Sequence, residues 1–200
     1  MANGIYKITE DFEKALADYT GAPYVVLTDG CTHALELCFR YDNVKSTAFT
    51  PYTYLSVPMT FMKLGLYFFF QDTKWEDYYY IENTNVVDAA VYWKKDGYIP
   101  KTFMCLSFQH KKHLSLGRGG AILTDNEESA EILKKMVYDG RLRDTPWAEQ
   151  NIDMLGYHYY MTPETAQLGL DKLDTAIATQ PKQWTTKDWP DLTKMEIFKK

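Results

Sequence analysis

The fold is decided by the stretch Ser107-Phe-Gln-His-Lys-Lys-His-Leu-Ser-Leu-Gly-Arg-Gly-Gly-Ala-Ile-Leu-Thr-Asp125. It predicts a strand that ends at Ser107, a tight glycine-rich turn over 117–120 and a second strand over 121–124. Lys111 and Lys112 stand between the two strands. Taken alone, these lysines would form only a solvated basic face.

Strands and helices alternate on both sides of this stretch. Short apolar runs predict strands at 24–28, 47–49, 66–70, 85–88 and 103–107, and the run at 66–70 is expected to be buried. Apolar spacings of three and four predict helices at 9–20, 31–39, 53–64, 126–138 and 162–178, with N-caps at Thr9, Asn126 and Thr162. Residues 139–161 lack periodicity and are expected to form a long loop. This alternation predicts an α/β fold with a largely parallel sheet.

Polar residues follow three of the predicted strands. Asp29, Asp88 and Ser107 each stand at a strand end, and ligands of parallel sheets bind at the carboxyl ends of strands. The turn 29–32 also leads directly into a helix, an arrangement that offers backbone N–H groups to an anion. We therefore expect one site at this edge, although Asp88 could also simply close its strand.

The composition is that of a globular protein. Of 200 residues, 46% are hydrophobic and 24% charged, and the formal net charge is −5. Such a chain buries a core without disulfide or metal staples, which excludes wholesale disorder. The acidic balance disfavours nucleic acid and anionic membranes, and we expect neither as a partner. Aromatic residues make up 16%, which indicates aromatic pockets or interfaces, or compositional bias of the source.

The cysteines and histidines indicate neither a disulfide framework nor a metal site. Cys31, Cys38 and Cys105 are odd in number and form no CxxC pair. His110 and His113 have the spacing of a metal pair but no third ligand nearby, so we expect no metal site. The first residues lack the apolar run of a secretory signal, and no apolar stretch is long enough to span a bilayer. We expect a cytoplasmic protein.

In this order, the motifs resemble those of the DegT/DnrJ/EryC1/StrS family of sugar aminotransferases, fold-type I enzymes dependent on pyridoxal 5′-phosphate (PLP). The resemblance extends from residue 8 to about residue 178. Its strongest part is Ser-Phe-x-x-x-Lys-x-Leu with Lys112, followed by Gly-x-Gly-Gly and a strand that ends Thr-Asp. The remaining parts are the helix and turn over 12–37, the residues Pro51, Thr53 and Tyr54, the Asp-Ala-Ala strand end at 88–90, and the loop 155–162.

The resemblance implies a fold and a domain organisation. It implies a three-layer α/β/α domain with a mostly parallel sheet, like the large domain of aspartate aminotransferase. Residues 1–178 would form this PLP-binding large domain, and residues 179–200 would be a C-terminal tail without a core of its own. The small C-terminal domain of the family would be absent.

The resemblance also assigns roles. Lys112 would form the Schiff base with PLP and move the substrate proton, with Lys111 as the competing lysine, and Asp88 would keep the pyridine nitrogen protonated. Cys31, Thr32 and Ser107 would hold the phosphate and Tyr54 would stack on the ring. His158 would contact the phosphate of a neighbouring subunit, which implies a homodimer with shared active sites.

The implied reaction moves an amino group from a donor such as glutamate to a nucleotide-linked keto-sugar. Some residues depart from the family pattern: Val91 replaces Gln, His158 and Tyr160 replace Asn and Arg, and the segment 51–88 is one strand–helix unit short. Two alternatives therefore stay open. One is a PLP enzyme of other specificity, such as an amino acid transaminase or a dehydratase, although family dehydratases carry histidine in place of Lys112. The other is a non-catalytic PLP-binding remnant.

Overall fold

The structure, a computed structural model, describes residues 3–199. Met1 and Ala2, at the start of the predicted domain 1–178, and Lys200, at the end of the predicted tail 179–200, lie outside the described residues. The helices are α1 (Asn3–Thr20), α2 (Cys31–Tyr41), α3 (Ser56–Leu64), α4 (Glu127–Val137) and α5 (Pro163–Ala178). The strands are β1 (Tyr24–Thr28), β2 (Ser46–Phe49), β3 (Tyr67–Phe70), β4 (Tyr79–Tyr80), β5 (Val86–Asp88), β6 (Phe103–Ser107) and β7 (Gly120–Thr124). Among the helices of residues 3–199, none has the length and apolar character needed to cross a membrane.

The main sheet has five strands in the order β1-β7-β6-β5-β4. The α/β fold is confirmed, but the sheet is mixed rather than mostly parallel: β5 and β6 are its parallel neighbours, and β2 and β3 form a separate parallel pair. The reason is that β7 follows β6 without an intervening helix, so it returns antiparallel. Since β7 is antiparallel to both β1 and β6, the strands β1, β5 and β6 still point in one direction.

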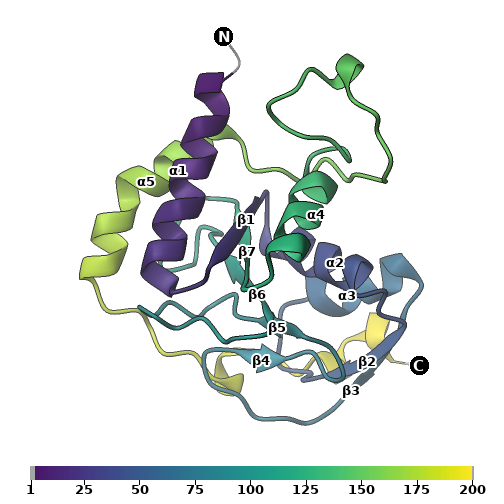
Figure 1. The fold of residues 1–200 in the computed structure, drawn as a ribbon. Helices are drawn as coiled ribbons and strands as arrows, with labels where there is room; N and C mark the ends of the chain where they lie inside the picture. The colour runs from purple at the N-terminus through teal and green to yellow at the C-terminus, as the bar shows by residue number, and fades with distance from the viewer. Residues whose placement is uncertain (1–2, 200) are drawn as a thin grey trace.

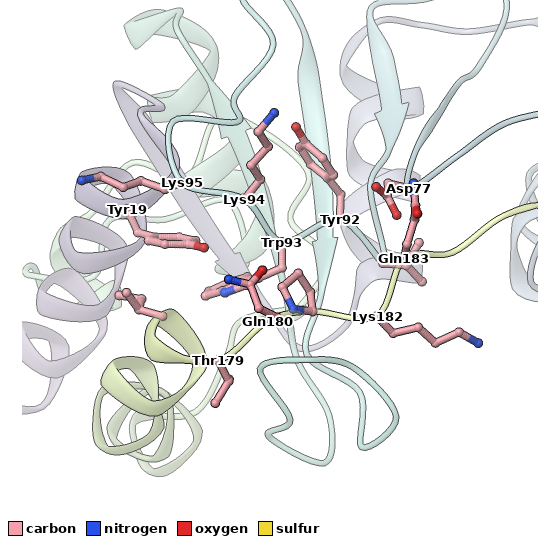
Figure 2. A pocket seen from close by; sticks show the side chains of 13 residues that line it. Tyr19, Asp77, Tyr92, Trp93, Lys94, Lys95, Thr179, Gln180, Lys182 and Gln183 are labelled. Atoms are coloured by element: carbon pink, nitrogen blue, oxygen red, sulfur yellow. The ribbon is translucent and has the colours of Figure 1, made fainter.

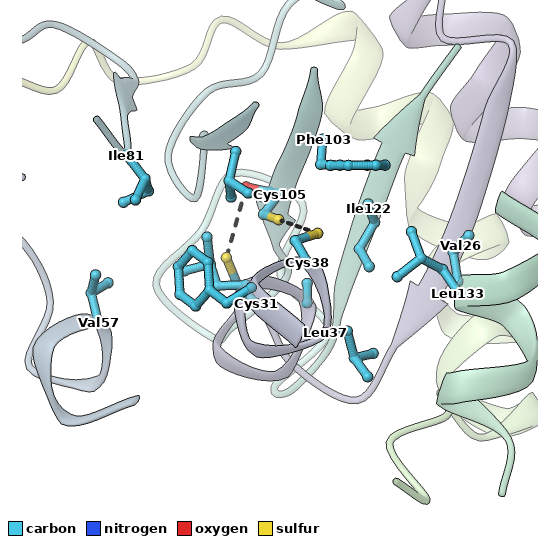
Figure 3. Close-up of a cluster of buried hydrophobic side chains, with 14 of the residues drawn as sticks. Val26, Cys31, Leu37, Cys38, Val57, Ile81, Phe103, Cys105, Ile122 and Leu133 are labelled. Atoms are coloured by element: carbon cyan, nitrogen blue, oxygen red, sulfur yellow. Dashed lines mark hydrogen bonds between the residues drawn. The ribbon is translucent and has the colours of Figure 1, made fainter. Parts of the chain in front are cut away.

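Two hydrophobic clusters cover the two faces of the sheet and give it three layers. Because side chains alternate along a strand, Val26 of β1 joins one cluster while Val25 and Leu27 join the other. The first cluster packs α2, α3 and α4 against the sheet, and the second packs α1 and α5 (Figure 1). Figure 3 shows the first cluster, in which Cys38 and Cys105 touch through their sulfur atoms, 3.8 Å apart.

The helix starts predicted at Asn126 and Thr162 are confirmed, and the one at Thr9 is wrong. The Asn126 side chain accepts a hydrogen bond from the Ser129 N–H, and the Thr162 side chain accepts one from the Thr165 N–H. Thr9 instead lies inside α1, where its hydroxyl donates to the Tyr6 carbonyl at 2.6 Å. A threonine hydroxyl can be satisfied within a helix in this way, so the residue type alone does not mark a helix start.

The strand predicted at 66–70 exists as β3, but it is only half buried. Phe68 faces the core, whereas Tyr67 and Phe69 are 71% and 68% exposed. β3 pairs with β2 on one side only and one of its faces is covered, so its side chains alternate between core and solvent.

The residues after α5 fold back onto the domain. The Leu192 N–H donates to the Pro51 carbonyl at 3.1 Å and its side chain is buried. The Phe198 ring packs edge-on against Phe70, with ring centroids 5.8 Å apart. Trp184, Trp189 and Phe198 pack against the first cluster, so this segment extends the core around α2 and α3.

The contact between α1 and α5 depends on Gly169, which has no side chain and lets the two helices approach each other. A Cβ at Gly169 would lie 2.4 Å from the ring of Phe12, which is fully buried. We expect Gly169→Ala to lower the free energy of unfolding by up to about 2 kcal/mol, because overpacking (about 1–3 kcal/mol) outweighs the helix propensity gained (about 1 kcal/mol). Urea unfolding measures this. The exposed Gln167→Ala on the same helix is the control, and a Gly169→Ala protein as stable as wild type would contradict the packing argument.

Candidate active site

A cavity of about 700 Å³ lies where β5 and β6 end and α2 begins. The lining includes residues that the sequence analysis singled out: Cys31, Thr32, Tyr54, Asp88, Ser107 and Lys112. These residues come from five different parts of the chain, and the common direction of β5 and β6 brings their polar ends to one edge. His158 is not among the lining residues.

Asp88 is the buried acid of the cavity, only 5% exposed at the end of β5. Its carboxylate accepts hydrogen bonds from the Tyr79 hydroxyl at 2.5 Å and from the Ala90 N–H at 3.0 Å. The Tyr79 oxygen in turn accepts from the Thr53 hydroxyl at 2.5 Å. Burial raises the pKa of Asp88, against the opposing effect of these bonds and of the Lys112 charge. Burial and the neighbouring carboxylate also raise the pKa of the Tyr79 phenol well above its usual range.

Tyr79 is a site residue that sequence reasoning missed. It faces Asp88 across the antiparallel pair β4–β5, which has only two residues in β4. A strand that short carries no readable periodicity, so neither the strand nor the contact has a signal in the sequence.

Lys112 is the partly buried cation of the cavity. Its backbone N–H closes a turn onto the Gln109 carbonyl at 2.8 Å, and its Nζ lies 5.8 Å and 5.6 Å from the ring centroids of Trp184 and Trp189. Burial lowers the pKa of its amine, partly offset by the Cys31 thiol and the Asp88 carboxylate. The neighbouring Lys111 is exposed. The two lysines therefore occupy different environments, and only Lys112 combines burial with a facing carboxylate.

A backbone cradle forms where α2 begins beside the start of β7. A Cβ on Gly120 would lie 2.5 Å from the Cys31 nitrogen and 2.6 Å from the Gly30 carbonyl carbon, so only glycine permits this approach. The last glycine of the Gly-x-Gly-Gly motif thus has a packing reason. The N-terminus of α2, with its positive end of the helix dipole, opens on the cavity beside Thr32, whose hydroxyl donates to the Ser56 hydroxyl at 2.7 Å.

The rim of the cavity carries several cationic or titratable groups: His33, His110, Lys111 and Arg118. Arg118 donates to the Asp29 carbonyl at 3.0 Å and to its carboxylate at 2.8 Å. His33 also contacts this carboxylate, at 2.5 Å, and stacks on Tyr159 with ring centroids 3.6 Å apart. Asp29 therefore orients two rim residues without lining the cavity itself. Sequence reasoning noted Asp29 but assigned no role to His33.

His158 and Cys31, both predicted to hold a phosphate, lie in different environments: His158 is exposed outside the cavity, and Cys31 is buried at its edge. The His158 side chain is 69% exposed on the loop 139–161, with Nδ1 3.0 Å from both carboxylate oxygens of Asp139. The Cys31 sulfur is buried and lies 3.7 Å from the Cys105 carbonyl, as Figure 3 shows. Burial raises the pKa of the Cys31 thiol well above its usual range, which leaves it a poor nucleophile.

The two histidines of the lysine segment are not arranged as a metal pair. His113 Nε2 lies 2.8 Å from the Ala176 carbonyl of α5, a structural hydrogen bond. Within residues 3–199, histidine, cysteine and carboxylate side chains form no cluster suited to a metal ion.

Comparisons with known proteins agree with this architecture. A curated relative, an uncharacterized protein of Methanocaldococcus jannaschii, is 35% identical over 109 residues, which are 50% of this chain and 28% of that protein. Among solved structures, Helicobacter pylori PseC, an aminotransferase involved in the biosynthesis of pseudoaminic acid, matches with a TM-score of 0.67 and 15% identity over 86% of this chain and 58% of that one. The sugar aminotransferase CalS13 from Micromonospora echinospora matches with a TM-score of 0.68 and 15% identity, over 86% and 61%.

These likenesses define how much of the fold is shared. The chain spans about 60% of the length of the solved structures and 28% of the curated relative. At such identities the structural matches establish the fold. The family itself is established by its sequence profile, which matches residues 3–100 and 93–186. The chain belongs to the DegT/DnrJ/EryC1/StrS aminotransferase family.

Proposed function

We propose that this chain forms the PLP site of an aminotransferase that transfers an amino group from a donor such as glutamate to a nucleotide-linked keto-sugar. The observation that carries the proposal is that a partly buried lysine, Lys112, and a buried carboxylate, Asp88, line the same cavity and act on each other electrostatically. The similar proteins of known structure include a sugar aminotransferase and an enzyme of pseudoaminic acid biosynthesis, which supports a sugar as the acceptor.

The donor set of the cavity fits PLP. Asp88 offers a carboxylate for the pyridine N–H, and Tyr79 and the Ala90 N–H hold that carboxylate in place. The Cys31–Thr32 turn and the Ser107 hydroxyl offer donors for the phosphate, with Gly120 giving the turn its room. Tyr54, which is 59% exposed on the cavity wall, offers a ring face to the cofactor. When bound, PLP supplies an aldehyde that takes up amino groups and a ring that accepts electrons.

Lys112 has the properties required to attach the cofactor and to move a proton. Only the neutral amine is a nucleophile or a base, and burial lowers the pKa of Lys112 toward that form. In the proposed reaction Nζ accepts the proton from Cα of the donor amino acid and delivers it at C4′ of the cofactor. The exposed Lys111 lacks this lowering by burial, so we assign both roles to Lys112.

The proposal includes a homodimer with shared active sites. Its support is the loop 139–161, on which Leu142, Trp147, Ile152 and Leu155 are exposed large apolar residues. Exposed apolar groups gathered on one segment are typical of interfaces. His158 lies on the same loop, outside the cavity of its own chain, and we assign it to the phosphate of the partner's cofactor.

We also propose a reducing compartment, the cytoplasm. Cys31, Cys38 and Cys105 are free and buried. Three unpaired thiols in one domain are typical of proteins that are kept reduced.

The function is tested by PLP incorporation and one half-reaction. We expect wild-type protein mixed with PLP and then borohydride to carry covalent cofactor at Lys112, located by peptide mass mapping. In a separate sample that is mixed with PLP but not treated with borohydride, added glutamate should yield one equivalent of 2-oxoglutarate per bound PLP before any acceptor is present. Lys112→Ala should lose both signals, and the matched control Lys111→Ala should keep both.

The outcomes separate the alternatives. Covalent PLP without 2-oxoglutarate from glutamate or other amino acids would favour a cofactor-binding protein without turnover. Cofactor trapped on Lys111, or in Lys112→Ala, would contradict the assignment of Lys112.

The rate of PLP attachment should depend on pH in a specific direction. Because burial lowers the pKa of Lys112, its neutral amine is present at lower pH than that of an ordinary lysine. The initial rate of covalent incorporation should therefore rise with pH and level off below the range in which N-acetyl-lysine amide reacts under the same conditions. A rate that follows the free lysine over the whole range would contradict a buried Lys112.

Asp88 should lower the stability of the protein without cofactor. Its pKa is raised in the folded state, so burying the charge costs stability above the folded pKa, and this cost vanishes below the unfolded pKa. We expect Asp88→Asn to raise the free energy of unfolding at neutral pH, less so as the pH falls, while PLP binding weakens by about tenfold or more. Urea unfolding at several pH values measures this, with the exposed Asp72→Asn as control. A gain that is the same at all pH values would contradict the charge argument.

A further inference from the structure

The residues between α5 and the end of the described chain are held across the cavity by a specific clamp. The Asp77 N–H donates to the Trp184 carbonyl at 2.8 Å, and the Trp184 N–H donates to the Asp77 carboxylate at 3.0 Å. Asp77 lies in the left-handed region, with φ of 61°. Figure 2 shows the segment leaving α5 at Thr179 and passing beside Asp77 at Gln183. This reciprocal contact, one bond between the two backbones and one to the Asp77 side chain, fixes the backbone from which the following side chains extend.

The clamp is continued by further bonds on both sides. The Thr186 N–H donates to the Trp75 carbonyl at 3.3 Å. Thr185 and Asp188 form a capping box around the short helical turn Thr186–Asp188. Lys182 contacts both ends of the segment, because its Nζ lies 4.0 Å from the Trp184 ring centroid and 2.6 Å from the Asp188 carboxylate. The backbone from 182 to 189 is thus a preorganised structure.

This segment places three side chains on the cavity that contains Lys112: Trp184, Asp188 and Trp189. The two indole rings stand 5.8 Å apart between centroids, and Lys112 Nζ lies within 6 Å of both. We call Trp184, Asp188 and Trp189 the aromatic wall. Two large flat rings beside the reacting amine offer a contact surface for a ring-shaped ligand.

Trp189 has a further property that points to a ligand. Its indole Nε1–H is buried, and it has no hydrogen-bond partner among the residues that the structure describes. A buried donor without an acceptor costs about 1–3 kcal/mol, and such groups are rare in folded proteins. A hydroxyl or carbonyl oxygen of a ligand, or an ordered water, would supply the acceptor.

The chemistry of the cavity lining divides into two kinds. His33, Lys111 and Arg118 on the rim suit the negative charges of phosphates and carboxylates. The aromatic wall instead offers apolar faces together with one acid, Asp188, and one indole donor. A neutral sugar ring presents C–H faces and hydroxyls, which match ring faces, an acceptor and a donor. The amino acid donor, with its carboxylates, matches the rim better.

We propose that the aromatic wall binds the sugar ring of the acceptor substrate, with Trp184 and Trp189 as the stacking faces and Asp188 and Trp189 Nε1 as the hydroxyl contacts. The family profile ends at residue 186, so Asp188 and Trp189 belong to sequence of this chain outside the match. The inference rests on the proposed function for the position of the cofactor, and two of the three residues to which it assigns the sugar, Asp188 and Trp189, lie outside the family match.

The test separates sugar binding from nucleotide binding by calorimetry on the PLP-treated protein. dTDP-glucose and UDP-glucose, which carry no keto group, are compared with dTDP and UDP. We define the sugar increment as the ratio of the affinity for a nucleotide sugar to the affinity for the same nucleotide without the sugar. For dTDP-glucose against dTDP, or for UDP-glucose against UDP, we expect this ratio to be about tenfold or more. Trp184→Ala and Trp189→Ala should reduce this increment toward onefold while the affinity for the nucleotide alone stays unchanged. Trp189→Phe, which keeps a ring and loses the N–H, should retain part of it.

The control is Tyr67→Ala, which removes an aromatic side chain that is 71% exposed on β3 and is not among the residues that line the cavity. It should keep the full sugar increment. An increment that survives in both wall variants, or a wild-type protein that incorporates PLP and shows no increment for either nucleotide sugar, would overturn the inference.

A second measurement needs no variant and covers the case in which the wall variants misfold. Hydrogen exchange of the wild-type protein should slow at residues 184–189 with dTDP-glucose or UDP-glucose relative to the nucleotide alone. Equal exchange with and without the sugar would overturn the inference. Failure of PLP incorporation with a retained sugar increment would count against the proposed function only, so the two failures are distinguishable.

Discussion

The buried carboxylate of Asp88 is the constraint around which the site is arranged. A carboxylate withdrawn from water is costly unless it is hydrogen-bonded or paired. Here the Tyr79 hydroxyl and the Ala90 N–H bind its oxygens, Thr53 supports Tyr79, and the Lys112 charge acts on it across the cavity. These partners come from separate segments, so a single charge fixes the relation between β4, β5 and the lysine turn. The residual cost, seen as a raised pKa, is typical of functional sites.

The second constraint is steric and concerns the backbone. The start of β7 and the start of α2 approach so closely at Gly120 that any side chain there would displace the Gly30–Cys31 turn. This contact joins the glycine motif to the N-terminus of α2, and both face the cavity that contains Lys112. Gly120, the N-terminus of α2 and Lys112 therefore lie together at one cavity, although α2 is distant from the other two in the sequence.

The segment after α5 adds two tryptophan rings, Trp184 and Trp189, to the lining of the cavity. Without it, the cavity would be lined by rim residues such as Lys111 and Arg118, by the buried Asp88, and by smaller groups such as Thr32 and Ser107, with Tyr54 as an aromatic ring. With it, the Lys112 amine lies within 6 Å of the ring centroids of Trp184 and Trp189, and burial lowers the pKa of this amine. The Asp77 clamp holds the backbone at Trp184 through one backbone bond and one bond to the Asp77 carboxylate. A rigid wall of this kind limits the entropy lost when a ligand binds.

The sequence by itself determined the alternation of strands and helices, the helix caps at Asn126 and Thr162, and the ordered motifs that bring Lys112, Asp88, Cys31, Thr32, Tyr54 and Ser107 to one cavity. These features are local: each depends on periodicity or on spacing within a few residues. The tertiary structure alone decided the mixed direction of the sheet, the exposure of Tyr67 and Phe69, the partnership of Tyr79 with Asp88, and the return of Trp184 and Trp189 to Lys112. The physical reason is that these contacts join segments far apart in the chain, and neither a two-residue strand nor an aperiodic segment carries a pattern that specifies its partner.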